Sequence, residues 1–308
     1  MSKELCLVSA SGGLDSSVTL AILDLAGYQN IVACHFKYGH RGEEAEELAI
    51  TNVCKELGIK LEIFDLRDLY TKLDTHSMLT DSNAPITTGT KSGLKKLDAW
   101  VVARNLMFMT IMGAYAESQV MKHDYSKVYL LGGFLNLTES GHYPDNSEAF
   151  LNACLNVFKY GTLIGNRIEP LYCLSNLTKF EEFALIKHFD LKNVYQHTIS
   201  CDRPIVKDPP LRFGPGPQKS SIAYNCSKDD MPACGSGLLS YWAAKMIGMN
   251  DMELRHFYEV DDPEYEAYIP DHIKNRFPKT YNIFDIVDRI LLPKDKIQNL
   301  KNILQTSN

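Results

Sequence analysis

The stretch LCLVSASGGLDSSV, residues 5–18, decides the fold of this chain of 308 residues. Its first four residues are apolar and predict a buried strand, and the apolar pattern of residues 18–25 predicts a helix. Between them, two glycines permit a sharp turn. Ser11, Ser16 and Ser17 place hydroxyls near the first free N–H groups of the helix. This pattern predicts a cradle that holds a phosphate at a helix N-terminus. It lacks the lysine of the GxxxxGK[ST] P-loop, and taken alone it also fits a turn that caps an ordinary helix.

The composition favours a globular protein that acts on a small molecule. Apolar residues make up 45% and charged residues 23% of the chain, with a net charge of −6. We expect no direct binding of nucleic acid, because the chain carries no broad basic field. No apolar run is long enough to cross a bilayer, and residues 1–10 predict a strand rather than a signal peptide. We therefore expect a cytoplasmic protein without membrane contact.

Most of the eight cysteines should serve as small apolar side chains without disulfides, as is usual in a reducing compartment. Those that lie singly in apolar segments are Cys6, Cys34, Cys54, Cys154 and Cys173.

Strand-like and helix-like segments alternate along the first half of the chain. We expect strands at 5–9, 31–36, 60–66 and 127–132, and helices at 16–26, 43–57 and 105–119. Continuous apolar strands separated by amphipathic helices predict an α/β fold, a doubly wound parallel sheet with helices on both faces. A ligand then belongs at the carboxyl ends of the strands, where the predicted cradle lies.

The second half is expected to be mostly helical and rich in loops. We expect residues 1–200 to form the α/β domain and residues 201–308 a loop-rich segment with a helical C-terminal extension. Residues 74–98 predict a lid or binding loop, and residues 201–232 predict further loops. The expected helices are 146–158, 179–189 and 237–246.

Four further motifs follow the cradle sequence in order. They are Phe36-Lys37-Tyr38-Gly39, then Arg104-Asn105, then Ser140-Gly141-His142-Tyr143-Pro144-Asp145, and finally Pro170-Leu171 with Lys179 and Glu181. Each by itself also fits an ordinary turn or surface segment. Together with Ser11-Gly12-Gly13-Leu14-Asp15-Ser16 they resemble the QueC family, the 7-cyano-7-deazaguanine synthases, over about residues 3–245. The first motif resembles the PP-loop of the ATP pyrophosphatase superfamily, so an adenine nucleotide alpha hydrolase-like fold is implied.

The resemblance implies ATP and Mg²⁺ as cofactors and a deazaguanine carboxylate as substrate. Asp15 would bind Mg²⁺, because a carboxylate beside a triphosphate is repelled without a cation. The implied ATP-binding residues are Ser9, Ser11, Gly12, Gly13, Leu14, Asp15, Ser16, Ser17, Phe36 and Tyr38. The implied catalytic residues are Asp15, Arg104, Lys179, Glu139 and Asp145, and the implied substrate-binding residues are Arg104, Asn105, Tyr143 and Asp145. Lys179 and Arg104 would offset phosphate charge, although either also fits a surface charge, and His142 is a candidate acid or base.

The sequence departs from the family pattern at two places. The family's structural zinc uses four cysteines, whereas only Cys226 and Cys234 match here, and two thiolates do not close a tetrahedral site. Cys201 could add a third ligand, but we do not expect zinc. Lys37 stands where the family commonly has Asp, which suggests altered chemistry or an altered partner.

Three functions are compatible with these motifs. The first is an ATP-dependent carbon–nitrogen ligase that activates 7-carboxy-7-deazaguanine and forms 7-cyano-7-deazaguanine (preQ0) with ammonia. The second resembles the QueC-like enzymes of antiphage systems, which join the deazaguanine to the N-terminal amine of a protein substrate. The third is a catalytically silent module that senses ATP. We expect a homodimer in each case, and the acidic composition disfavours a tRNA-modifying enzyme.

Overall fold

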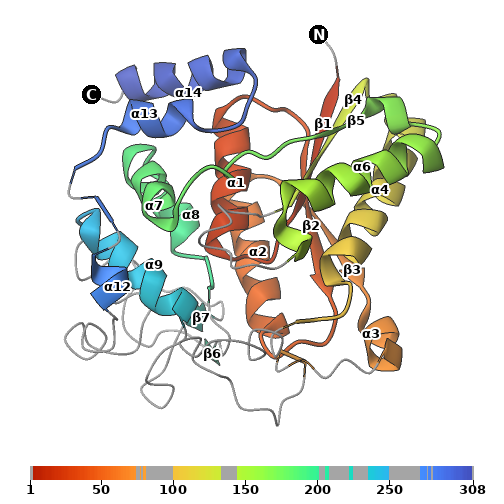
Figure 1. Ribbon diagram of the computed structural model, residues 1–308, viewed down its shortest axis with the longest axis horizontal. Coiled ribbons are helices and arrows are strands. Elements are labelled where there is room, and N and C mark those ends of the chain that lie inside the picture. Colours follow the sequence, from red (N-terminus) through yellow and green to blue (C-terminus); the bar gives the residue numbers. More distant parts are fainter. Residues whose placement is uncertain are drawn as a thin grey trace.

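A five-stranded parallel sheet lies at the centre of the computed structural model (Figure 1). The structure describes residues 3–73, 77, 79–80, 100–132, 144–200, 205–207, 222–224, 235–249, 271–275, 277–278 and 280–306. The strand order is β3-β2-β1-β4-β5, and every pairing is parallel. The strands are β1 (Glu4–Ser9), β2 (Ile31–Lys37), β3 (Lys60–Asp65), β4 (Lys127–Leu131) and β5 (Ile168–Pro170).

Helices cover both faces of this sheet, which confirms the predicted doubly wound α/β fold. Helices α1 (Leu14–Leu25) and α2 (Glu43–Leu57) lie on one face, and α4 (Arg104–His123) and α6 (Glu148–Gly161) lie on the other (Figure 1). The chain adds β2 and β3 on one side of β1 and then β4 and β5 on the opposite side. The order therefore reverses between β1 and β4, and such a switch point opens a crevice at the carboxyl ends of the strands.

The remaining helices lie mainly beside α1. They are α7 (Lys179–His188), α8 (Lys192–Tyr195), α9 (Gly235–Met246), α12 (Asp271–Lys274), α13 (Ile283–Asp288) and α14 (Lys294–Thr306). Helix α3 (Arg67–Leu73) follows β3, and two 3₁₀ turns, η2 (Pro144–Asn146) and η3 (Gly165–Arg167), flank α6.

Two hydrophobic cores lie against the two faces of the sheet. The first joins α1 and α2 to α7, α9, α13 and α14, with Leu20, Phe183 and Leu300 fully buried within it. The second joins the sheet to α4 and α6. The C-terminal helices thus share a core with the cradle helix, whereas a domain boundary at residue 200 stays a prediction.

The sequence predicted the long elements closely and missed short ones. Helix α2 spans the predicted 43–57, and α1 begins two residues before the expected Ser16. The expectation of loops alone in 201–232 was wrong, because β6 (Ile205–Lys207) and β7 (Ile222–Tyr224) pair there as antiparallel strands. Most of the predicted loop 74–98 lies outside the described residues.

Two further properties of the described residues bear on the sequence predictions. The five cysteines that the structure describes are buried and free, as expected of small apolar side chains. None of the helices within the described ranges combines the length and apolarity that a membrane span requires.

Candidate functional site

The turn between β1 and α1 presents its N–H groups to hydroxyl oxygens. The Gly13 N–H donates a hydrogen bond to Ser11 Oγ, and the Leu14 N–H donates one to Ser200 Oγ, each at 3.2 Å. Both N–H groups lie at the N-terminus of α1, where backbone donors attract anions. The two hydroxyls therefore occupy positions that phosphate oxygens would take in a cradle.

Gly12 makes the closest approach in this turn. Its φ is +81°, and a Cβ atom there would lie 2.7 Å from the Ile50 nitrogen and 2.9 Å from the Glu46 carbonyl oxygen on α2. The Gly12 carbonyl accepts a hydrogen bond from the Ile199 N–H at 2.9 Å. Only glycine fits this position, because it needs both a positive φ and the space of a missing side chain. The cradle is thus enclosed between α2 and the chain at residues 198–200.

Strand β2 fixes the base of the cradle. The Ala10 N–H donates to the Cys34 carbonyl at 2.9 Å, and His35 Nδ1–H donates to the Ala10 carbonyl at 3.0 Å. His35 is buried, and burial lowers its pKa against the opposing effects of the Ala10 hydrogen bond and the charge of Glu46. A neutral imidazole that donates from Nδ1 therefore holds the last carbonyl before the turn.

Three charged side chains meet beside the cradle. Lys179, the first residue of α7, forms an ion pair with Asp15 of α1, and its Nζ lies 3.1 Å from Glu182 Oε2. The Lys179 and Glu182 side chains are buried, whereas that of Asp15 is 34% exposed. Burial raises the pKa of Glu182, and the charge of Lys179 opposes this shift. The structure thus places Lys179 beside the cradle, and its role toward a phosphate stays a prediction.

Asp15 is a suitable ligand for the implied Mg²⁺, but the described residues do not supply a complete set of protein ligands. One carboxylate with phosphate oxygens and waters is an ordinary ligand set for Mg²⁺. Among the described residues, no group of three or more His, Cys, Asp or Glu is placed to hold a metal ion. The partly exposed Asp15 carboxylate therefore suits an ion that arrives with a triphosphate.

Tyr38 and Arg104 form a second group, from the ends of β2 and α4. Arg104 Nη1 donates to Tyr38 Oη at 3.1 Å, and its guanidinium lies 5.8 Å from the Tyr38 ring centroid. The same ring stacks on His40 at 4.5 Å, and His40 Nε2 lies 3.2 Å from Glu46 Oε2. Because the backbone of Glu46 borders the cradle and its side chain borders His40, α2 joins the two groups into one region.

Asn105 and Asp145 lie beside Arg104. Asn105 Nδ2 donates to Asn146 Oδ1 at 3.1 Å and to the Asp145 backbone carbonyl at 3.4 Å. Burial raises the pKa of the Asp145 carboxyl, and the positive charge of Arg104 opposes the shift. The structure therefore brings together three of the residues predicted to bind substrate: Arg104, Asn105 and Asp145.

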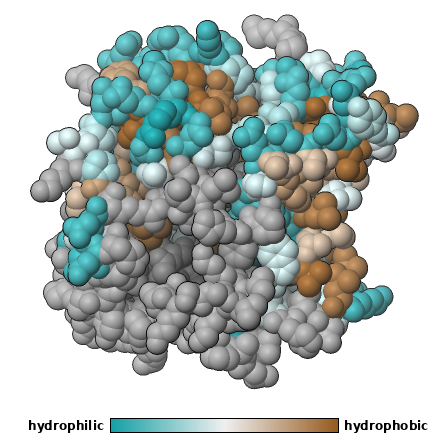
Figure 2. Space-filling model, in the orientation of Figure 1, coloured by the Kyte–Doolittle hydropathy of each residue, from teal (hydrophilic) through white to brown (hydrophobic). Residues whose placement is uncertain are grey.

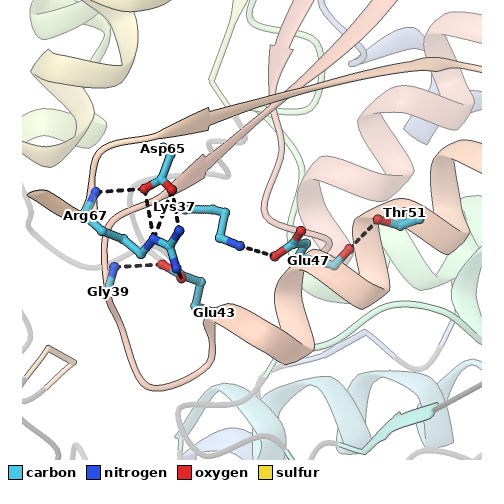
Figure 3. Close-up of polar contacts among 7 residues, drawn as sticks. All are labelled: Lys37, Gly39, Glu43, Glu47, Thr51, Asp65 and Arg67. Carbon is cyan, nitrogen blue, oxygen red and sulfur yellow. Dashed lines mark hydrogen bonds and ion pairs between the residues drawn. The ribbon is translucent and has the colours of Figure 1, made fainter.

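The turn after β2 is held by an ion-pair network (Figure 3). The Gly39 N–H donates to Glu43 Oε2 at 2.7 Å, and Arg67 Nη1 lies 3.9 Å from Glu43 Oε1. Arg67 also pairs with Asp65 at the end of β3, with Nε 2.9 Å from Oδ1. The network fixes the segment that carries Tyr38.

Lys37 lies beside this network, and its side chain extends toward α2, where it is paired within the chain (Figure 3). Its Nζ lies 2.6 Å from Glu47 Oε2 on α2 (Figure 3). The Lys37 side chain is 18% exposed and that of Glu47 34%. The positive charge at this position is thus balanced by a carboxylate of the neighbouring helix.

Other predicted site residues have contacts within the fold instead. The Phe36 ring is buried and stacks on Phe108 at 4.1 Å, so it packs in the core beneath α4. Ser16 Oγ donates to the Gly13 carbonyl at 3.2 Å, and Ser17 is fully buried. Ser9 is the last residue of β1. The remaining candidates, Glu139, His142, Tyr143, Cys201, Cys226 and Cys234, lie outside the described residues.

Glu182, Ser200 and His35 were not among the predicted site residues. The Lys-x-Glu motif pointed instead to Glu181, whose carboxylate accepts hydrogen bonds from the Thr178 N–H and O–H at 2.8 and 3.0 Å. Glu181 therefore caps α7. A second acidic residue directly after the motif was the available signal for Glu182.

The sequence model of the family described as "Queuosine biosynthesis protein QueC" matches residues 5–209, which ends before the expected residue 245. The "7-cyano-7-deazaguanine synthase" of Campylobacter hominis is 32% identical over 201 residues, 65% of this chain and 84% of that protein. The "7-cyano-7-deazaguanine synthase 2" of Sulfurisphaera tokodaii is 34% identical over 177 residues, 57% of this chain. The match spans little more than a third of that archaeal relative, 36% of its length.

Among solved structures, an NH3-dependent NAD synthetase from Campylobacter jejuni is 18% identical and covers 64% of this chain and 69% of its own, with a TM-score of 0.35. That score is too low to carry an argument about this chain.

Proposed function

We propose a function for this chain from one premise: it belongs to the QueC family, the queuosine biosynthesis proteins. The proposed reaction is ATP-dependent activation of the carboxylate of 7-carboxy-7-deazaguanine, followed by amidation with ammonia and conversion to 7-cyano-7-deazaguanine. The observation that carries the proposal is the cradle at Gly12–Leu14 with Lys179 and Asp15 beside it. The curated relatives with this name support the choice of substrate.

In the proposed first step, a carboxylate oxygen of the substrate attacks the α-phosphorus of ATP. The bond from that phosphorus to the bridging oxygen breaks, and pyrophosphate leaves with the electron pair. The N–H groups of Gly13 and Leu14 exchange the hydroxyls of Ser11 and Ser200 for phosphate oxygens when ATP binds, and they then stabilise the charge that grows on the leaving oxygens. Lys179 adds a positive charge at the same place. Mg²⁺, when bound, neutralises part of the phosphate charge.

Ammonia then attacks the activated carbonyl carbon, and AMP leaves as the amide forms. A second ATP activates the amide oxygen, and loss of that oxygen with its phosphate group gives the nitrile. The chain's task in both rounds is to hold phosphates and exclude water. This shared task explains how one cradle serves two activations.

The group around Arg104 is the proposed binding place for the deazaguanine. Arg104 is charged, the buried Tyr38 holds its guanidinium through the hydroxyl, and Asp145 is a half-buried carboxyl beside them. A carboxylate accepts hydrogen bonds from the N–H edge of a guanine-like ring, which suits Asp145. Glu139 and Tyr143 stay in the proposal as further contacts from the sequence pattern.

Conjugation to a protein amine is the second candidate reaction. It was considered because Lys37 stands where the family commonly has Asp. The ion pair between Lys37 and Glu47 offers a structural reason for that departure, since the lysine is balanced within the chain. We therefore favour ammonia as the amine. A silent ATP-sensing module is disfavoured by the charged pair Asp15 and Lys179 beside the cradle.

A cytoplasmic homodimer completes the proposal. Large apolar side chains are exposed near the end of α6, with Val157 67%, Tyr160 82% and Leu163 88% exposed. Hydrophobic side chains gather on the right-hand side of the view, where α4 and α6 lie (Figure 2). Exposed apolar patches often mark contact surfaces between proteins. Light scattering of the purified protein should give twice the mass of one chain.

The test combines purified protein, ATP, Mg²⁺, 7-carboxy-7-deazaguanine and ammonium, with pyrophosphate and products measured by mass spectrometry. Pyrophosphate should appear only with the deazaguanine, and Asp15→Asn should reduce its release by about 100-fold or more. Asp24→Asn is the matched control, because Asp24 lies on the same helix but is exposed near its C-terminal end. Equal release by wild type and Asp15→Asn would contradict the assignment, and amide without nitrile would favour conjugation.

A further inference from the structure

Lys179 is held between two carboxylates that differ in their surroundings. Asp15 lies on α1 at the edge of the cradle with a side chain 34% exposed, whereas the Glu182 side chain is 0% exposed. Glu182 Oε2 lies 3.1 Å from Lys179 Nζ, one turn further along α7. The lysine therefore has one partner that a ligand can reach and one that it cannot.

Glu182 is a costly residue for its place in the fold. It lies on the buried side of α7 between the core residues Phe180 and Phe183, where an apolar side chain of similar volume would fill the space. Its Oε1 has no hydrogen-bond partner among the described residues. Buried carboxylates are destabilising unless they are paired, and replacing a buried ion pair by apolar residues is often neutral for stability. Packing alone does not explain a glutamate here.

We propose that Glu182 is a positioning residue that keeps Lys179 at the cradle when Asp15 turns from the lysine to the cation of a bound triphosphate. This inference rests on the proposed function. Without Glu182, the lysine would lose its buried carboxylate partner and would move more easily with the leaving pyrophosphate. With Glu182, the ammonium keeps a fixed partner before, during and after release of that group.

Glu181 is the rival for this role, and its contacts exclude it. Its carboxylate accepts two hydrogen bonds from Thr178 and pairs with Arg289, which precedes α14. It thus points away from Lys179 and serves as the cap of α7. Because it is the preceding residue on the same helix, Glu181→Gln is a matched control for Glu182→Gln.

The first experiment needs no catalysis. The folded protein is treated briefly with acetic anhydride, and acetylation of Lys179 is followed by mass spectrometry of its peptide. Glu182→Gln should be acetylated about tenfold faster than wild type, because the lysine loses its charged, buried partner. Asp15→Asn and Glu181→Gln should stay within about threefold of wild type. If Asp15→Asn is acetylated as fast as Glu182→Gln, the proposed anchoring is wrong.

The second experiment measures pyrophosphate release with ATP and the deazaguanine carboxylate. Glu182→Gln should lower kcat about tenfold or more while the KM for ATP stays within about threefold, because the anchor acts during release. Glu181→Gln should keep both values near those of wild type. A rise in KM at unchanged kcat would overturn the inference. If wild type itself releases no pyrophosphate, the proposed function fails while the acetylation result still decides the anchoring.

A second variant separates positioning from folding. Glu182→Leu keeps the volume and removes the charge. Its melting temperature should fall, because the buried Lys179 loses one of its two carboxylate partners and keeps Asp15, so kcat is measured per folded protein. Its kcat should nevertheless fall as in Glu182→Gln. Wild-type kcat in the folded Leu variant, or a loss of kcat matched by a loss of folded protein, would contradict the proposal.

Discussion

The turn after β1 and the turn after β2 both contain a glycine with φ near +80°, but their surroundings differ. Gly12 has φ +81° and lies against the backbone of α2. Gly39 has φ +79°, and a Cβ atom added there would meet no atom of the described residues within 4 Å. The first turn is enclosed by backbone and buried groups, whereas the second is held by partly exposed ion pairs (Figure 3). The first turn therefore has no room for an added side chain, whereas the second has room for one.

The largest predicted effect follows from replacing each glycine by alanine. Gly12→Ala should destabilise the protein by about 3 kcal/mol or more, because strain at positive φ adds to overpacking against α2. Gly39→Ala should cost only the backbone strain, about 1 kcal/mol. Urea unfolding followed by circular dichroism measures both. Equal losses would show that the two turns are held alike.

A smaller effect is expected from the imidazole beneath the first turn. Burial lowers the pKa of His35 below 6.5, so the unfolded chain binds more protons than the folded one as pH falls through that value. Stability is therefore retained above about pH 6.5 and lost toward lower pH, by at most about 2 kcal/mol at about pH 5. The charges of Glu46 and Glu47 oppose this lowering of the pKa and moderate the loss, whereas the charge of His40 adds to it.

His35→Gln should remove this pH dependence, because an amide can still donate to the Ala10 carbonyl but does not titrate. The measurement is urea unfolding of wild type and variant at several pH values between about 5 and 8. His123→Gln is the control, since His123 is exposed on α4. If the free energy of unfolding changes with pH in the same way in wild type and in His35→Gln, the assignment of a neutral His35 imidazole is wrong.

The smallest effect belongs to the ion pairs of the second turn. Arg67→Ala should cost about 0.5 kcal/mol or less, because exposed pairs are screened and Arg67 is 51% exposed. The difference from wild type should disappear at about 1 M salt. Urea unfolding at low and high salt tests this. A loss above about 2 kcal/mol would mean that the network is as essential as the buried contacts at Gly12.

Sequence reasoning was strongest where a local pattern determines a local structure. The alternation of apolar strands and amphipathic helices predicted the sheet, and the two glycines with Ser11 predicted the cradle. Short elements such as α3 and β5 were missed, because a few residues carry too little periodicity to stand out. The edge position of β5 also explains how Pro170 fits in a strand, since no further strand of the described residues needs its missing N–H.

The site was predictable only where its residues lie in one motif. Lys179 was found, but its partner Glu182 was not, since spacing cannot tell which of two neighbouring carboxylates turns inward. Ser200 lies 186 residues from Leu14 and meets it through the folded chain alone. Long-range contacts of this kind depend on tertiary packing rather than on local pattern.

The attachment of the C-terminal helices has a consequence for how the chain acquires its structure. Asn299 and Lys296 of α14 donate to the carbonyls of Ala26 and Gly27, at the end of the cradle helix, and Leu300 is buried in the same core as Leu20. A nascent chain folds from its N-terminus as it is synthesised. Here the C-terminal end of α1 gains its last covering only once residues about 270 positions later have emerged. During synthesis this end needs protection from aggregation, and truncations before α14 should be recovered mainly as insoluble protein.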